Sequence, residues 1–282
     1  HPNRVISYFG DNHPVYAGNV VKAMASARDG YGHISQLFEK SVSALNSKDQ
    51  AKREEQFEAL AATLDDGLLA TVSHVKRLNP TIVEVVIRSK WAAQKFRPGQ
   101  FYRLQNFERL APMVDGTRLQ MEGIALTGAW VDKKKGLLSL IVLEMGGSSR
   151  LCATLAKGTR VVIMGPTGAP TEIPKNETVA LVGGGLGNAV LFSIAKALKD
   201  NGCRVLYFAG YKKAEDLFKR DEIEVATDQV IWSPDPGSTQ IPTRRPLDKS
   251  FTGNIVQAMI AYADGSWGEP HISMREITRM IV

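Results

Sequence analysis

The chain has 282 residues, 44% of them hydrophobic and 23% charged, which is typical of a soluble globular protein with one large or two ordinary domains. The net charge of +6 comes from scattered lysines and arginines, which favours anionic cofactors or an acidic partner over nucleic acid. Two cysteines are too few for an iron–sulfur cluster or a disulfide framework. We find no signal peptide and no apolar run of membrane-spanning length, and therefore expect no membrane association and a cytoplasmic location.

Residues 1–66 are predicted to be helical and to form a linker or docking segment. A first helix is expected to be capped near Asp11, and a second helix is expected after a break at Gly30 and Gly32. Ser47 resembles the start of a capping box for a third helix. The chain starts without methionine and stops inside an apolar run, so we expect a piece of a longer polypeptide.

Residues 67–174 change to short β-branched segments separated by turns, which predicts a small antiparallel β-barrel. The expected strands are 70–75, 82–87, 101–104, 123–127, 137–143 and 160–164.

Residues 175–282 alternate strands with helices, which predicts an α/β doubly wound parallel sheet. Strands are expected to end at 183, to span 205–209 and 229–232, and to begin again at 279, with helices that follow 187, open at 214 and span 251–262. The predicted fold class is a helical N-terminal segment, an antiparallel β-barrel and this α/β domain.

The segment 179–198 is the most informative, because an apolar run passes through four glycines into a helical pattern. Glycine allows a tight turn and a close approach to phosphate, and the helix that follows offers free N–H groups. Asn188 occupies the slot where the fingerprint G-x-G-x-x-G would have its last glycine. The segment is therefore either a dinucleotide loop or a tight turn without a ligand. Its glycines are Gly183, Gly184, Gly185 and Gly187.

Tyr211, Lys212 and Lys213 follow the second strand of the α/β domain, where the adenosine ribose of a dinucleotide would lie. Two lysines without a carboxylate favour NADPH over NADH, although exposed lysines in a turn can also be simply solvated. The histidines lack metal-ligand spacing and no Ser–His–Asp or Cys–His set is recognisable, so we expect neither a metal site nor a hydrolase.

Four motifs follow one another along the chain: Arg97–Phe101 contains P-G-Q-F, Gly146–Leu151 is a Gly-Gly-Ser-Ser loop, Gly165–Gly168 is a G-P-x-G turn, and Val182–Gly187 is the glycine loop. Together they resemble the ferredoxin–NADP reductase superfamily, from about residue 68 to the end. Within it, the chain is most similar to the electron-transfer subunit of dihydroorotate dehydrogenase and to glutamate synthase-associated reductase modules.

The resemblance implies an FAD-dependent NAD(P)H oxidoreductase module, with FAD on the barrel (67–174) and NADPH or NADH on the α/β domain (175–282). It also implies an iron–sulfur or flavin electron-transfer partner, which can belong to the same parent polypeptide. The alternative is a non-catalytic docking or nucleotide-sensing module with a degenerate flavin site, and a third reading is a stand-alone flavin reductase.

The resemblance also assigns site residues. For the nucleotide these are the four glycines, Asn188, Tyr211, Lys212 and Lys213. Thr127 is expected at the flavin ring as the catalytic residue, although a threonine in a strand can simply be a β-former. The other expected flavin contacts are Tyr102, Arg103, Leu126, Gly146, Gly147, Ser148 and Ser149, with core packing as the alternative for Tyr102 and a helix cap for the Gly-Ser loop.

The family's arginine is absent from the flavin motif, because the aligned residues are Ile124–Thr127. Arg103, Arg118 and Arg150 are the candidates to supply the missing positive charge.

Overall fold

The structure, a computed structural model, describes residues 7–282, and the chain divides into two compact units between Ala62 and Thr63. None of the helices within residues 7–282 is both long and apolar enough to cross a membrane.

The first unit is helical, as predicted, but its helix boundaries differ from the expected ones. The helix α1 runs without a break through Gly30 and Gly32. A glycine costs only about 1 kcal/mol inside a helix, which is too little to end one of this length. At Gly30 a Cβ atom would lie 2.5 Å from Cε1 of Phe9, so this glycine makes room for an aromatic ring. The elements of the first unit are η1 (Gly10–Asn12), α1 (Val20–Ser43), η2 (Ser47–Asp49) and α2 (Gln50–Leu68), the last of which continues into the second unit.

The helix caps also differ from the expected ones. Asn19 caps α1, since its Oδ1 accepts a hydrogen bond of 2.8 Å from Lys22 N, whereas Asp11 lies in η1. Asn46, and not Ser47, caps η2 through a 3.0 Å hydrogen bond from Lys48 N to its Oδ1.

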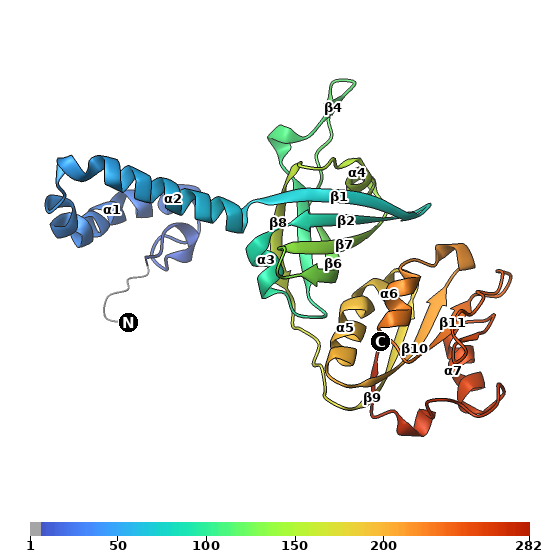
Figure 1. Cartoon of the computed structure of the whole chain (residues 1–282). Helices are drawn as coiled ribbons and strands as arrows, with labels where there is room; N and C mark the ends of the chain where they lie inside the picture. The colour runs from blue at the N-terminus through green and yellow to red at the C-terminus, as the bar shows by residue number, and fades with distance from the viewer. Residues whose placement is uncertain (1–6) are drawn as a thin grey trace. The chain divides into compact units, whose positions relative to one another are not determined.

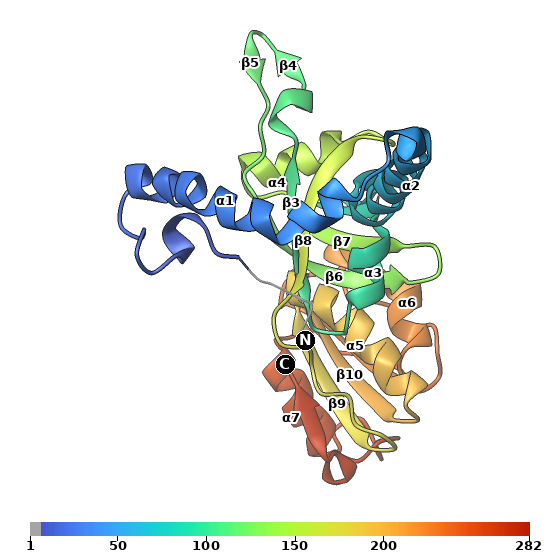
Figure 2. The same cartoon turned by 90° about the vertical axis from the view of Figure 1, so that its left-hand side faces the viewer.

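The predicted barrel is confirmed. Six antiparallel strands close in the order β1-β2-β7-β6-β3-β8. A hairpin of β4 (Met113–Val114) and β5 (Thr117–Arg118), which the sequence did not reveal, projects from the barrel between β3 and β6 (Figure 2). The barrel strands are β1 (Ala70–Asn79), β2 (Ile82–Arg88), β3 (Phe101–Asn106), β6 (Ile124–Asp132), β7 (Leu137–Leu143) and β8 (Arg160–Thr167), with α3 (Lys90–Lys95), η3 (Glu108–Leu110), α4 (Gly147–Leu151) and η4 (Cys152–Thr154) in the connections.

The register of β3 decides which of its side chains face the barrel interior. Phe101 pairs with Thr127 and Arg103 pairs with Ala125 on β6. Successive residues of a strand point to opposite faces, and Tyr102 and Leu104 are fully buried in the barrel core. Phe101 and Arg103 therefore lie on the outer face of the barrel.

The second half of the unit is the predicted parallel sheet, in the order β12-β11-β10-β9-β13. The helix expected to open at 214 is only the short turn η6 (Ala214–Asp216), and α6 begins at Arg220. The strands of this domain are β9 (Thr178–Gly184), β10 (Arg204–Tyr211), β11 (Gln229–Pro234), β12 (Lys249–Ser250) and β13 (Arg279–Ile281). Its helices are η5 (Gly185–Gly187), α5 (Asn188–Asp200), α6 (Arg220–Val225), α7 (Ile255–Ala263) and η7 (Met274–Glu276).

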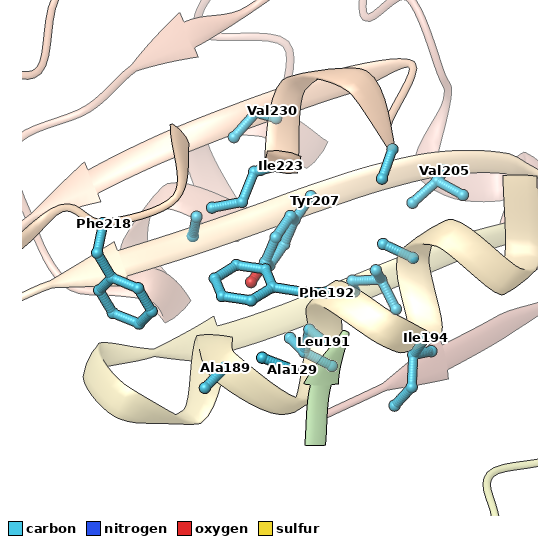
Figure 3. Close-up of a cluster of buried hydrophobic side chains, with 14 of the residues drawn as sticks. Ala129, Ala189, Leu191, Phe192, Ile194, Val205, Tyr207, Phe218, Ile223 and Val230 are labelled. Atoms are coloured by element: carbon cyan, nitrogen blue, oxygen red, sulfur yellow. The ribbon is translucent and has the colours of Figure 1, made fainter. Parts of the chain in front are cut away.

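The sheet is covered by α5 and α6 on one face and by α7 on the other (Figures 1 and 2). The core on the α5 side also includes residues of the barrel. Figure 3 shows Ala129 of β6 beside Ala189 and Leu191 of α5. One hydrophobic cluster therefore joins the barrel to the sheet, beside the separate core inside the barrel.

Candidate functional site

The glycine loop between β9 and α5 is shaped by two different requirements for glycine. At Gly183 a Cβ would lie 2.4 Å from Asn188 Oδ1 and 2.7 Å from Leu191 Cδ1, so only glycine lets α5 pack this closely on the strand. Gly185 has a φ of +52°, a left-handed conformation that favours glycine, and open space where a side chain would begin. The first glycine thus serves packing, and the second leaves the backbone exposed.

Asn188 is buried, and its side chain holds the loop in place. Its Nδ2 donates to the carbonyl oxygens of Gly185 (2.9 Å) and Gly210 (3.2 Å). Its Oδ1 accepts a 2.6 Å hydrogen bond from the hydroxyl of Tyr207. One of these bonds runs to η5 and the other two run to β10, so the side chain is engaged in holding the loop, and contact of Asn188 with a cofactor remains a prediction.

A pocket of about 480 Å³ opens at the carboxyl ends of β9, β10 and β11, beside the start of α7. This is the edge at which open parallel sheets bind ligands. Gly184 and Gly185 line it on one side, and Gly210 on another, where a Cβ would lie 2.4 Å from Ile255 Cδ1. A second hollow of about 500 Å³ shares Lys212 and Asp235 with the first.

The three residues predicted to follow β10 have different environments. Lys212 is exposed and has no ion pair within residues 7–282, whereas Lys213 pairs with Glu215 at 3.3 Å. Tyr211 borders the pocket, but it is buried and packs edge-on against Phe218 at 6.2 Å between ring centroids. Burial raises the pKa of Tyr211, and its hydroxyl has no hydrogen-bond partner in the described part of the chain. Of the three, only Lys212 offers a free charged group to the pocket.

Sequence reasoning missed the carboxylate of Asp235. This residue follows β11 directly and lines both hollows together with Lys212. The preference for NADPH depends on lysines without a neighbouring carboxylate, and Asp235 contradicts that condition. The position of Asp235 shortly after a predicted strand could have indicated this, because the carboxyl ends of neighbouring parallel strands meet at one edge of the sheet.

Arg103 lies on the outer face of β3, beside the start of the segment Ile124–Thr127. Its Nε donates to the carbonyl oxygen of Gly123 at 3.1 Å, and a Cβ on Gly123 would lie 2.9 Å from that nitrogen. Arg118, in contrast, donates to three carbonyl groups of its own loop, and Arg150 is exposed on α4. Among the three candidates, Arg103 is therefore the one that borders the segment from which the family's arginine is missing.

Tyr102 points into the barrel, and Leu126 packs against the same core. The Tyr102 hydroxyl donates to Ala92 O at 3.0 Å, and its ring stacks on Phe96 with centroids 5.9 Å apart. The structure therefore supports core packing for Tyr102 and not stacking on a cofactor. The neighbouring Phe101 is the outward aromatic residue, with 38% of its surface exposed.

The Gly-Ser loop before α4 divides its two hydroxyls between different tasks. Ser149 Oγ accepts from the amides of Met145 (3.0 Å) and Gly146 (2.9 Å), which makes it a helix cap. Ser148 Oγ accepts from Glu122 N at 3.0 Å and keeps its own hydrogen available. Gly146 and Gly147 are exposed, with open space at their Cβ positions. Ser148 and the loop backbone are thus the groups free to contact a ligand.

No family model matches the chain. An uncharacterized protein of Rickettsia prowazekii is 38% identical over 201 residues, which are 71% of this chain and 26% of that protein. A homologue of the electron transfer subunit of dihydroorotate dehydrogenase B (NAD(+)) from Thermotoga maritima is 31% identical over 150 residues, 53% of this chain and 49% of that protein. The chain thus spans about a quarter of the first relative and about half of the second.

A solved structure of an NADH-dependent reduced ferredoxin–NADP oxidoreductase, described for flavin-based electron bifurcation, superposes with a TM-score of 0.56 at 26% identity. The match covers 68% of this chain and 62% of that one. Sequence similarity, the closed barrel and the parallel sheet lead to the same result. The chain is therefore similar in sequence and in fold to proteins of the ferredoxin–NADP reductase superfamily.

Proposed function

We propose that the chain is an FAD-dependent NAD(P)H oxidoreductase module that relays electrons to an iron–sulfur or flavin partner. The barrel (67–174) would bind FAD, and the α/β domain (175–282) would bind the nucleotide. The observation that carries the proposal is the pocket at Gly184 and Gly185, on a sheet that one hydrophobic cluster joins to the barrel. The similarity to electron-transfer subunits and reductases supports it.

The outer face of the barrel has groups that fit FAD. Arg103 offers a guanidinium, which suits a pyrophosphate, and Thr127 pairs with Phe101 on the same face of the sheet. Ser148 and the exposed backbone of Gly146 and Gly147 add hydrogen-bond donors. Bound FAD would supply a group that takes two electrons as hydride and releases them singly. Thr127 would orient that group through its hydroxyl.

The sheet pocket has groups that fit a pyridine nucleotide. The backbone of Gly184 and Gly185 would lie against the pyrophosphate, and Asn188 would hold the loop in the required shape. Lys212 favours a 2′-phosphate, whereas Asp235 favours a ribose hydroxyl. The two side chains thus favour different nucleotides, so NADH and NADPH are both tested as electron donors.

The visible absorption spectrum of the purified chain tests the proposal, recorded before and after anaerobic addition of NADPH and, separately, NADH. We expect flavin bands that bleach with at least one nucleotide. A colourless protein that FAD cannot reconstitute would refute the proposal and favour a non-catalytic docking or nucleotide-sensing module. Flavin bands that neither nucleotide bleaches would refute the nucleotide half alone.

A further inference from the structure

A buried carboxylate and a lysine whose side chain is 9% exposed meet where the barrel contacts the α/β domain. Glu84, on the outer face of β2, is 3% exposed, and Lys219 Nζ lies 2.8 Å from its Oε1. The same oxygen accepts hydrogen bonds from two side chains of the barrel, Ser139 Oγ at 2.5 Å and Trp130 Nε1 at 2.7 Å. Three donors from three segments of the chain thus converge on one oxygen atom.

Both members of the pair are charged in the folded protein. Burial alone would raise the pKa of Glu84, but hydrogen bonds from Lys219 and Ser139 outweigh burial and leave this pKa below its ordinary value. Burial alone would lower the pKa of Lys219, but its bonds to Glu84 and Glu222 (2.9 Å) leave that pKa above its ordinary value. A buried ion pair contributes little net stability, so its consequence is better sought in orientation.

Apolar side chains of both domains also pack together at this interface. Ile82, Ala129 and Ile141 of the barrel belong to the same cluster as α5 (Figure 3 shows Ala129 there). Apolar contacts are non-directional, so alone they tolerate sliding of one surface over the other. The ion pair is directional, and a second bond between the domains, from Asn79 Nδ2 to Asp216 O at 3.0 Å, lies on the segment that leads to Lys219.

We propose that Lys219 and Glu84 are positioning residues that hold the nucleotide-binding sheet against the flavin-binding barrel in one orientation. This inference rests on the proposed function, since the orientation sets the distance across which hydride would pass. Misplacement of reacting groups by about 1 Å can lower a rate by about 100-fold, so a loosened interface would affect the transfer rate more than the binding of either cofactor.

The test variant is Lys219→Met, which removes the charge and keeps an unbranched side chain. Lys219 has a φ of +55°, and methionine retains the Cβ atom and therefore the same backbone cost. The matched control is Lys196→Met, which breaks a pair of the same length, 2.8 Å to Asp200, on the exposed surface of α5. Glu84→Gln is the second variant, because its amide oxygen can still accept from Ser139 and Trp130.

Two measurements are made on each purified protein. In anaerobic stopped-flow at saturating nucleotide, Lys219→Met should reduce its flavin about 10- to 100-fold more slowly than the control, with unchanged flavin content and nucleotide affinity. In hydrogen exchange without nucleotide, the amides of β6 and α5 that face each other should exchange at least about tenfold faster than in the control.

Rates and exchange equal to those of the control would overturn the proposal. If the wild-type flavin is not reduced at all, the proposed function fails. Hydrogen exchange alone then decides whether the ion pair holds the two domains in one orientation. If Lys219→Met does not fold, Glu84→Gln decides by the same two measurements, and control-like values in it overturn the proposal.

Discussion

The substitution Asn188→Ala tests whether this residue builds the loop or touches the ligand. Its side chain makes three hydrogen bonds inside the protein and is fully buried. Alanine would leave the Tyr207 hydroxyl and the Gly210 carbonyl buried without these partners. Each unpaired buried group costs about 1–3 kcal/mol, so we expect the free energy of unfolding to fall by about 2–6 kcal/mol.

The measurement is urea denaturation followed by circular dichroism, with the unfolding free energy extrapolated linearly to water. Tyr207→Phe is the intermediate case, because it removes only the 2.6 Å bond to Asn188 and should cost about 1–3 kcal/mol. In the double variant, Tyr207→Phe should cost less than it does alone, since the two residues share that bond.

The opposite pattern would refute this reasoning. If Asn188→Ala changes the unfolding free energy by less than about 0.5 kcal/mol, the buried hydrogen bonds are not worth what their geometry indicates. If, in addition, the affinity for NAD(P)H falls about tenfold, the side chain must reach the ligand, as the glycine-loop motif first suggested.

Three further predictions concern the barrel, the loop and the domain interface. Arg103→Ala should weaken FAD binding about 10- to 100-fold in equilibrium dialysis, because it removes a charged donor, whereas Arg150→Ala should change it less; equal losses would contradict the assignment. Gly185→Ala should cost about 1–2 kcal/mol in urea denaturation because of its φ of +52°, and Gly184→Ala, whose Cβ would have its nearest neighbour at 3.7 Å, should be close to neutral; similar costs would argue against backbone strain. Because the folded pKa of Glu84 is below its ordinary value of 4.5, its charge stabilises the fold above that pH, and the stability is lost as the pH falls through the folded pKa. The difference in unfolding free energy between wild type and Glu84→Gln should therefore be constant from pH 7 to about 4.5 and shrink below it, and a difference that grows there would show the opposite sign.

Local sequence signals were sufficient for the order of the domains and for most of their elements, but not for the hairpin of β4 and β5. The β-branched runs predicted the barrel, and the glycine loop between a strand and a helix predicted the parallel sheet, because both patterns act over a few neighbouring residues. Boundaries were less well predicted where a distant contact overrides a local preference. At Gly30 the ring of Phe9 occupies the space of a side chain, so a glycine that resembled a break lies inside a helix.

The candidate site depended more strongly on tertiary structure. The sequence places Phe101 and Tyr102 side by side, but only the burial of Tyr102 in the barrel core shows that the Phe101 ring faces outward. Asn188 sits at a motif position, but its hydrogen bonds run to β10, about 20 residues away in the sequence. The position of Arg103 beside Gly123 likewise requires the two strands to be paired.

The contacts that join the domains were beyond the reach of sequence. Asp235 reaches the pocket of Lys212 because two parallel strands end at the same edge, and Lys219 reaches Glu84 only after the barrel and the sheet have packed together. By itself, therefore, the sequence determined most of the strands and helices, since backbone preferences and hydrophobic periodicity are local. The tertiary structure alone decided which polar side chains meet, because burial and charge pairing depend on residues that are far apart along the chain.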